Sequence, residues 1–237
     1  MSVNNQDFYD ELINSLSKMG HIRPEEFPNI DLYMDQVTTF MSEHFMNEKS
    51  APDDKILTKT MINNYAKDNL LPPPVKKKYS KDHMIVLLFI YYLKNILSIN
   101  DIQSIMNPLT ESFFGTDKKS EEINMSDIYS HVYDIAKSGL DNISDDIRKK
   151  IQSSEESFTD ITNPEHKDFL QYFSLMCMLS YDIYLKKQVL GMMVDKLKTD
   201  EDIKKEAEKK TEKKAEKKAD KKAEKKAEKK TEKKAEK

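Results

Sequence analysis

The chain has little cysteine and little glycine, and both shortages exclude classes of fold. It holds one Cys and four Gly among 237 residues. A single cysteine excludes a disulfide within the chain and any cysteine-rich zinc site. Few glycines, together with abundant Leu, Ile, Met, Lys and Glu, favour helices joined by short connections over a sandwich or a barrel. The composition therefore predicts an all-α protein.

Long apolar runs are also absent. The longest uncharged apolar run covers residues 169–181, which is shorter than the roughly 18–20 residues needed to cross a bilayer. The first residues do not combine a basic start with an apolar stretch, as a secretion signal would. We therefore expect a cytoplasmic protein with no membrane-spanning segment.

Signatures of catalysis are missing as well. The sequence has no glycine-rich phosphate loop and no helical pair of His with an intervening Glu. Cys177 lies in an apolar run, where a thiol usually packs in the core and keeps a high pKa. We expect a binding protein and no enzyme, with no cofactor and no metal, and the sequence points to no known small-molecule ligand. The histidines show no metal-ligand spacing and are interpreted as surface or helix-end residues: His21, His44, His83, His131 and His166.

What the sequence does contain is charge, unevenly distributed. Residues 1–200 hold 22 of the 39 Lys and Arg and 31 of the 42 Asp and Glu, a net charge of −9, whereas residues 201–237 carry +6. Within the acidic part, residues 55–81 hold seven Lys against Asp68 alone, again +6. Such a basic island can bind phosphates locally. A solvated basic loop is the alternative.

The basic island predicts a short capped helix followed by a rigid turn. Thr58 is a suitable N-cap, because its hydroxyl can accept from the free N–H groups of the first turn. Asn69 suits the left-handed residue after the last turn, and the three prolines from Pro72 forbid continuation of the helix. Apolar spacing predicts a buried face of Leu57, Met61, Ile62 and Tyr65 and an outer face of Lys59, Thr60, Asn63 and Lys67.

Apolar spacing also predicts two helices before this island. The first covers residues 5–18, with one apolar face made of Phe8, Leu12, Ile13 and Leu16. The second begins after Pro28, near Asp31, and its apolar stripe consists of Leu32, Met34, Val37, Phe40, Met41 and Phe45.

Two helices follow the island. Ser80 caps the third helix, whose apolar residues from Met84 to Tyr92 leave no polar face. A helix that is apolar all round is buried all round. Ser98 caps a short fourth helix, which we expect Pro108 to end.

The next part reads as a linker and two longer helical regions. Residues 109–123 are expected to form the linker, with an apolar anchor at two phenylalanines. A helix from Ser126 is expected to break near Gly139, and a last helix covers residues 167–197. Their surplus apolar surface is our candidate for pairing two chains. The residues of the Ser126 helix expected to face inward are Ile128, Val132, Ile135 and Ala136.

From Lys205 the chain repeats a four-residue unit close to Lys-Lys-Ala-Glu. Because a helix turns every 3.6 residues, this period places like charges four residues apart, where they repel. No apolar stripe is present to pack, so we expect a solvated, partly helical tail. Two interpretations stay open: an inert solubilising tail, or a tail that adds weak, salt-sensitive affinity for nucleic acid.

The segment from Leu57 to Met106 resembles the winged helix-turn-helix of MerR-type transcription regulators. Those proteins carry a reading helix, a Gly-Leu-Leu-Pro end, a wing, and Tyr-Ser at the head of the next helix. A Ser-Leu-Glu-Glu-Ile segment follows. The matching residues here are Thr58, Ile62 and Tyr65, then Asn69-Leu70-Leu71-Pro72, Tyr79-Ser80, and Ser98-Ile99-Asn100-Asp101-Ile102.

The sequence departs from that pattern at two places. Asn63 and Asn64 replace a phosphate-contacting Arg and a Tyr, and the wing is cut to Pro-Pro-Pro-Val-Lys-Lys-Lys. Only the DNA-binding geometry is therefore carried over, and MerR effector chemistry is not. The body from Pro28 to Leu197 also resembles a bacterial domain-of-unknown-function family, number 1836, whose presumed role is that of a DNA-binding regulator.

Together these features predict an all-α fold: a MerR-like winged helix-turn-helix with a truncated wing, a C-terminal helical region and a charged low-complexity tail. The expected parts are residues 1–27 (an N-terminal helix), 28–108 (the DNA-binding domain), 109–200 (a dimerisation or regulatory region) and 201–237 (the tail).

We expect a transcriptional regulator that binds double-stranded DNA, as a homodimer. The helix over residues 58–68 would enter the major groove, where an Asn amide pairs well with an adenine edge. The lysines would neutralise phosphates. For Tyr65, core packing is the alternative to a phosphate contact, and for Asn63 and Asn64 the alternative is an ordinary exposed surface. The alternative function is a helical adaptor that binds another protein. The expected DNA-contacting residues are Thr58, Lys59, Thr60, Asn63, Asn64, Tyr65, Lys67, Lys76, Lys77, Lys78 and Lys81.

Overall fold

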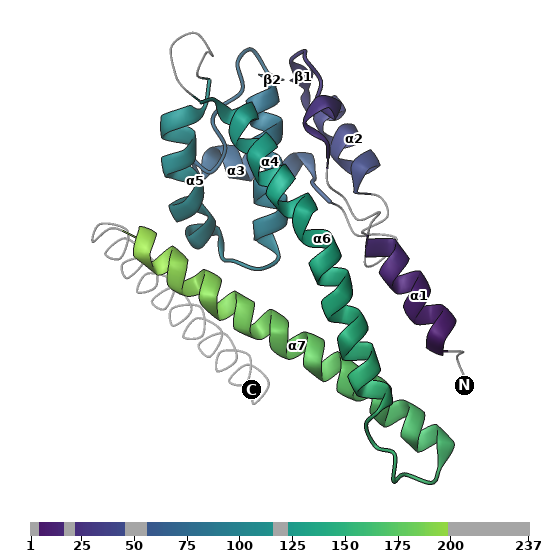
Figure 1. The fold of residues 1–237 in the computed structure, drawn as a ribbon. Coiled ribbons are helices and arrows are strands. Elements are labelled where there is room, and N and C mark those ends of the chain that lie inside the picture. Colours follow the sequence, from purple (N-terminus) through teal and green to yellow (C-terminus); the bar gives the residue numbers. More distant parts are fainter. Residues whose placement is uncertain (1–4, 17–21, 46–55, 116–122, 199–237) are drawn as a thin grey trace, which may run out of the picture. The chain divides into compact units, whose positions relative to one another are not determined.

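A computed structural model describes residues 5–16, 22–45, 56–115 and 123–198 (Figure 1). The chain divides into two units, residues 1–191 and 192–237. The expected charged tail lies outside the described residues. Helix dominates the described part, as the composition predicted. The elements are α1 (Asn5–Leu16), the 3-10 helix η1 (Pro24–Glu26), β1 (Leu32–Tyr33), α2 (Met34–His44), α3 (Lys59–Lys67), β2 (Lys78–Tyr79), α4 (Lys81–Lys94), α5 (Ile99–Phe113), α6 (Met125–Glu155) and α7 (Pro164–Leu197).

The main hydrophobic core forms around α4. Every side chain from Met84 to Leu88 is buried, and so are Ile90 and Tyr91. This confirms the expectation that the helix is buried all round. The core takes in residues from Ile22 to Tyr129. It therefore includes residues on both sides of the domain boundaries expected after residues 27 and 108.

A two-stranded antiparallel sheet replaces part of the expected second helix. Leu32 was expected on the apolar stripe of that helix, but it lies in β1 and pairs with Tyr79 of β2. Tyr33 pairs with Lys78 in the same sheet. Leu32 is buried here as a strand residue. The expectation failed because the pairing partner lies far along the chain, where local spacing cannot reveal it.

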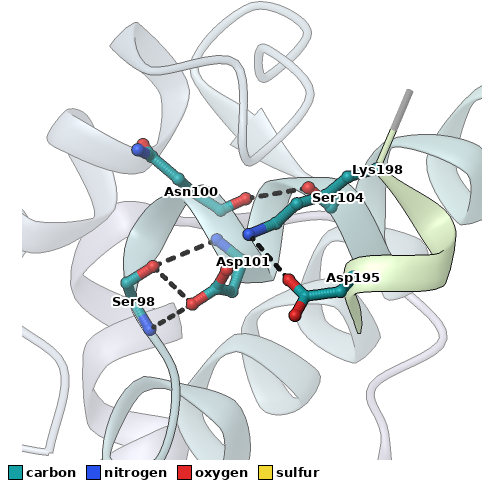
Figure 2. Close-up of polar contacts among 6 residues, drawn as sticks. All are labelled: Ser98, Asn100, Asp101, Ser104, Asp195 and Lys198. Carbon is teal, nitrogen blue, oxygen red and sulfur yellow. Dashed lines mark hydrogen bonds and ion pairs between the residues drawn. The ribbon is translucent and has the colours of Figure 1, made fainter. Parts of the chain in front are cut away.

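The fourth expected helix is longer than the sequence suggested. Ser98 caps it as expected: its Oγ accepts from the Asp101 N–H at 3.2 Å and donates to the Asp101 carboxylate at 2.6 Å (Figure 2). However, α5 continues through Pro108 to Phe113, so residues 109–113 are not a linker. Leu109 and Phe113 pack against the main core, and this packing offsets the backbone hydrogen bond that a proline removes.

Helix α6 is continuous and begins one residue before the expected start. Its N-cap is Asn124, whose side chain accepts from the Asp127 N–H at 3.1 Å. The expected break near Gly139 is absent from α6. The expected inward face is partly wrong, because Val132 is 44% exposed and Ile135 is 73% exposed. Tyr129 turns inward instead: its hydroxyl donates to the Ile22 carbonyl oxygen.

A second, smaller core joins α1, α6 and α7. It consists of Tyr9, Ile13, Ile151 and Leu175. The expected face of α1 is therefore partly wrong, since Tyr9 is buried and Phe8 is 38% exposed. The Lys150 ammonium strengthens the α6–α7 connection, because it lies 2.5 Å from the Asp146 carboxylate and 2.8 Å from that of Asp182.

Helix α7 carries the largest set of exposed apolar side chains. Cys177, expected in the core, is exposed on this helix. Phe169 and Phe173 are exposed and stacked, with ring centroids 6.1 Å apart.

In the second unit, the Lys198 ammonium lies 3.4 Å from the Asp195 carboxylate (Figure 2).

Candidate nucleic-acid interface

Helix α3, the expected reading helix, has the caps that the sequence predicts. The Thr58 hydroxyl accepts from the Met61 N–H at 3.1 Å. At the other end, Asn69 has a φ of 55°, and the N–H groups of Leu70 and Leu71 both donate to the Tyr65 carbonyl oxygen, at 2.8 and 3.1 Å. These bonds satisfy groups that a helix terminus leaves unpaired.

The two faces of α3 differ as expected. Ile62 and Tyr65 lie in the main core. Tyr65 is 6% exposed, and burial raises the pKa of its hydroxyl. Of the two interpretations of this residue, core packing therefore describes its position. The side chains on the exposed face are Lys59, Thr60, Asn63, Asn64 and Lys67.

Long-range hydrogen bonds hold α3 from both ends. The Lys94 ammonium, on α4, donates to the Ile56 carbonyl oxygen at 2.7 Å, just before the N-cap. The Gln103 amide, on α5, donates to the carbonyl oxygen of Asp68, just after the last turn. A helix of only nine residues is marginal alone, so these contacts and the buried face fix its position.

Residues 75–79, within the expected wing, form a tight hairpin that we call the lysine hairpin. Val75 and Lys78 exchange two backbone hydrogen bonds of 3.1 and 2.9 Å. The two residues between them, Lys76 and Lys77, have φ values of 51° and 64°, as a type I′ turn requires. Asn and Gly are the usual residues there. Each lysine in this left-handed region costs roughly 1–2 kcal/mol, and both side chains are exposed.

A buried histidine fastens the base of the lysine hairpin to α4. His83 is 2% exposed, so it is a helix-end residue as expected but does not lie on the surface. Its Nδ1 accepts from the Ser80 N–H at 3.0 Å. In the neutral ring the proton is therefore on Nε2, which lies 3.4 Å from the Pro73 carbonyl oxygen. Burial lowers the pKa of His83.

The structure separates the six expected phosphate-binding lysines into two groups. Lys81 donates to the Pro24 carbonyl oxygen at 3.2 Å, Lys59 forms an ion pair with Asp35, and the Lys78 ammonium lies 5.4 Å from the centroid of the Tyr33 ring. Lys81 is thus held against η1, away from the expected role. The lysines that are exposed and form no ion pair with any described residue are Lys67, Lys76 and Lys77.

The Lys59–Asp35 ion pair and the pairing of Lys78 with Tyr33 bring the start of α3 close to the two-stranded sheet. The ion pair places Lys59 next to Asp35, in the first turn of α2. Asp35 follows Tyr33 by two residues, and Tyr33 pairs with Lys78 of the lysine hairpin. Sequence reasoning missed Tyr33, because a strand of two residues shows no alternation from which to assign a face.

The described residues give no sign of a metal site or a membrane span. Across residues 5–16, 22–45, 56–115 and 123–198, no group of three or more His, Cys, Asp or Glu side chains is placed to hold a metal ion. Within the same ranges, no helix is both long enough and apolar enough to cross a bilayer.

Part of the chain is similar to one family of known domains. Residues 22–132 match the model of the family described as a domain of unknown function, DUF1836. This match supports the resemblance to that family, over a shorter part of the chain than the expected range of residues 28–197, and it does not bear on the resemblance to MerR-type regulators. Its limits nearly coincide with the main core, which runs from Ile22 to Tyr129. No match was found among curated proteins or among solved structures.

Proposed function

We propose that residues 22–132 form the DNA-binding domain of a non-enzymatic transcriptional regulator. The observation that carries the proposal is the lysine hairpin: a strained two-residue turn that presents Lys76 and Lys77 to solvent, connected to a short helix with a polar outer face. Backbone strain persists where the surrounding structure holds it, and it gathers at functional sites. Two adjacent lysines at a turn that favours Asn and Gly are understandable if their charges bind phosphates.

In this proposal α3 enters the major groove. Asn63 and Asn64 are exposed on its outer side. An Asn side chain can bind an adenine edge as a bidentate pair, because its NH2 group donates to adenine N7 and its carbonyl oxygen accepts from the N6 amino group. Thr60 is exposed one turn earlier and suits a base or a phosphate oxygen. The bonds from Lys94 and Gln103 fix the helix, so that its side chains need little reordering on binding.

Phosphate contacts would supply most of the non-specific affinity. With three lysines free of ion pairs, each releasing about 0.9 counterion, the slope of log affinity against log salt should be about −2.7. The slope would steepen to about −4.5 if DNA also draws Lys59 from Asp35 and Lys78 from the Tyr33 ring. The contacts made by lysine position the duplex and do not select its sequence.

A homodimer would present two such domains to inverted half-sites. Its proposed seam is on α7, on a different side from Leu175, the residue that packs into the smaller core. Phe169, Phe173, Met176 and Ile183 follow one another on that side at steps of four, three and seven residues, and each is exposed. Steps of three and four place apolar side chains in the seam of a two-helix coiled coil.

A helical adaptor remains the second candidate, favoured by one observation. Asp35, an acidic residue with a side chain 75% exposed, lies at the candidate interface and would repel phosphates. A duplex presents a continuous row of phosphates, whereas a partner protein can place acidic groups at Lys76 and Lys77 and a basic group at Asp35.

Fluorescence anisotropy with a labelled random-sequence duplex at low salt separates the two functions. The regulator should saturate the duplex at micromolar concentration or below. Saturation should survive an excess of polyglutamate at matched ionic strength. No binding to the duplex, with binding to polyglutamate, would support the adaptor and overturn the regulator.

A further inference from the structure

The outer face of the small sheet carries a row of three side chains from three adjacent chain segments. Lys78 is the central residue: it pairs with Tyr33 of β1 on one side and with Val75 on the other. Directly paired residues of antiparallel segments project to the same face. The opposite face holds Leu32 and Tyr79, which are both buried. The row Tyr33–Lys78–Val75 therefore points away from the core.

Two exposed residues of this row, Val75 and Tyr33, have largely apolar side chains. Val75 is 69% exposed and Tyr33 is 54% exposed, and the Lys78 ammonium lies over the Tyr33 ring. Lys76 and Lys77 form the turn that joins Val75 to Lys78. The surface thus alternates apolar, cationic and apolar groups, next to two further cations.

The sugar–phosphate backbone of a duplex has the complementary alternation, with apolar sugar faces between anionic phosphates. The width of the row decides where it can rest. Three adjacent segments at roughly 4.8 Å spacing make a row about 10 Å wide, whereas the minor groove is about 6 Å wide. The row is too wide to enter that groove, but it can lie across a strand at the groove edge.

We propose that Tyr33, Lys78 and Val75 form a contact surface for the sugar–phosphate backbone of one DNA strand, beside the groove that α3 enters. This inference rests on the proposed function and extends the interface to β1. Tyr33 and Val75 pack against deoxyribose, and Lys78 moves from the Tyr33 ring to a phosphate. The surface holds the duplex against the lysine hairpin and does not read its sequence.

The double variant Y33T/V75T tests this surface, because Thr keeps strand propensity while it removes apolar contact area. I30T is the matched control: Ile30 is 69% exposed, precedes β1 and lies outside the paired row. Duplex affinity of Y33T/V75T should fall about tenfold, from lost apolar burial. Its salt slope should stay that of the wild type, because no counterion-releasing charge is removed. I30T should bind within about twofold of wild type by the same burial argument.

Urea unfolding checks that both variants are folded. If Y33T/V75T does not fold, V75T alone is used for the binding test, because this change is exposed and nearly isosteric. V75T should weaken binding about threefold. If wild type binds the duplex while folded Y33T/V75T and V75T bind equally well, the contact surface is wrong and the regulator stands. If wild type itself does not bind the duplex, both proposals are overturned.

Discussion

Asp35, in the first turn of α2, forms an ion pair with Lys59, the first residue of α3, and both side chains are largely exposed. If α3 binds DNA, this carboxylate opposes binding in two ways: it repels phosphates and it occupies Lys59. D35N should therefore bind a random duplex about fivefold more tightly, as expected for one surface charge in a high-dielectric setting. The salt slope should steepen by up to about 0.9, because Lys59 becomes available.

D160N is the control for D35N. Asp160 is exposed on the connection between α6 and α7, so its replacement makes the same change in net charge away from the interface. D160N should leave the salt slope unchanged. An equal gain in affinity for both variants would show that net charge alone is responsible and that Lys59 lies outside the contact.

The turn of the lysine hairpin offers a test that separates stability from binding. K76N/K77G places favoured residues at the two positions of positive φ. The free energy of unfolding should rise by about 1–2 kcal/mol, from relief of left-handed strain partly offset by glycine entropy. K76A/K77A, which keeps the strain, should show no such gain in urea unfolding. Both variants lose the same two charges, so both salt slopes should become less steep by about 1.8.

His83 should make stability depend on pH in one direction. Burial lowers its pKa in the folded state, while the unfolded chain has the ordinary value of about 6.5. Below that pH, His83 is protonated in the unfolded chain but stays neutral in the folded chain until the pH reaches its lower folded-state pKa. The free energy of unfolding should therefore fall as pH drops below about 6.5, by at most about 1.4 kcal/mol per pH unit from this group. Above that pH its contribution is constant.

H83N should lack this part of the pH dependence, because its amide oxygen can still accept from the Ser80 N–H but does not titrate. H166N is the matched control, since His166 is exposed at the start of α7. Urea unfolding of the three proteins at several pH values between 5 and 8 is the measurement. Identical pH profiles for wild type and H83N would contradict the assignment of His83 as a buried neutral group.

The seam on α7 predicts an oligomeric state. F173E places a charge at the centre of the exposed apolar row, where a second copy would have to bury it. Sedimentation equilibrium at micromolar concentration should give a dimer for wild type and a monomer for F173E. Q188E, an exposed change on a different side of the same helix, should stay dimeric. A monomeric wild type, with duplex DNA present, would contradict the dimer.

Local chemistry made α3 and α4 predictable. A threonine hydroxyl at the N-cap, an Asn in the left-handed position and a following proline act within a few residues of the helix end, so Thr58 and Asn69 reveal the ends of α3 without a fold. The all-apolar pattern of α4 likewise requires burial in any arrangement.

Features that depend on distant partners were not predictable in this way. The strand at Leu32 exists because it pairs with Tyr79, and α5 passes Pro108 because Leu109 and Phe113 reach the core. Exposure on α6 was misassigned for the same reason: apolar spacing shows that Ile135 belongs to a face but not whether a neighbour covers it.

In the candidate site, too, the features set by local sequence were predictable and those set by distant partners were not. Its exposed polar residues on α3 follow from the buried ones, since a helix has two faces. The engagement of Lys59 and Lys81 does not follow, because their partners Asp35 and Pro24 belong to other elements. Counting lysines along the sequence therefore does not reveal which of them already contact other parts of the protein.

The salt dependence of duplex binding tests the central claim most directly. Anisotropy titrations of wild type and of K67A/K76A/K77A should be made with one random duplex over a range of salt concentrations. The account predicts a slope of log affinity against log salt of about −2.7 or steeper for wild type, and a loss of about 2.7 in the triple variant. A wild-type slope that survives these three substitutions unchanged would contradict it.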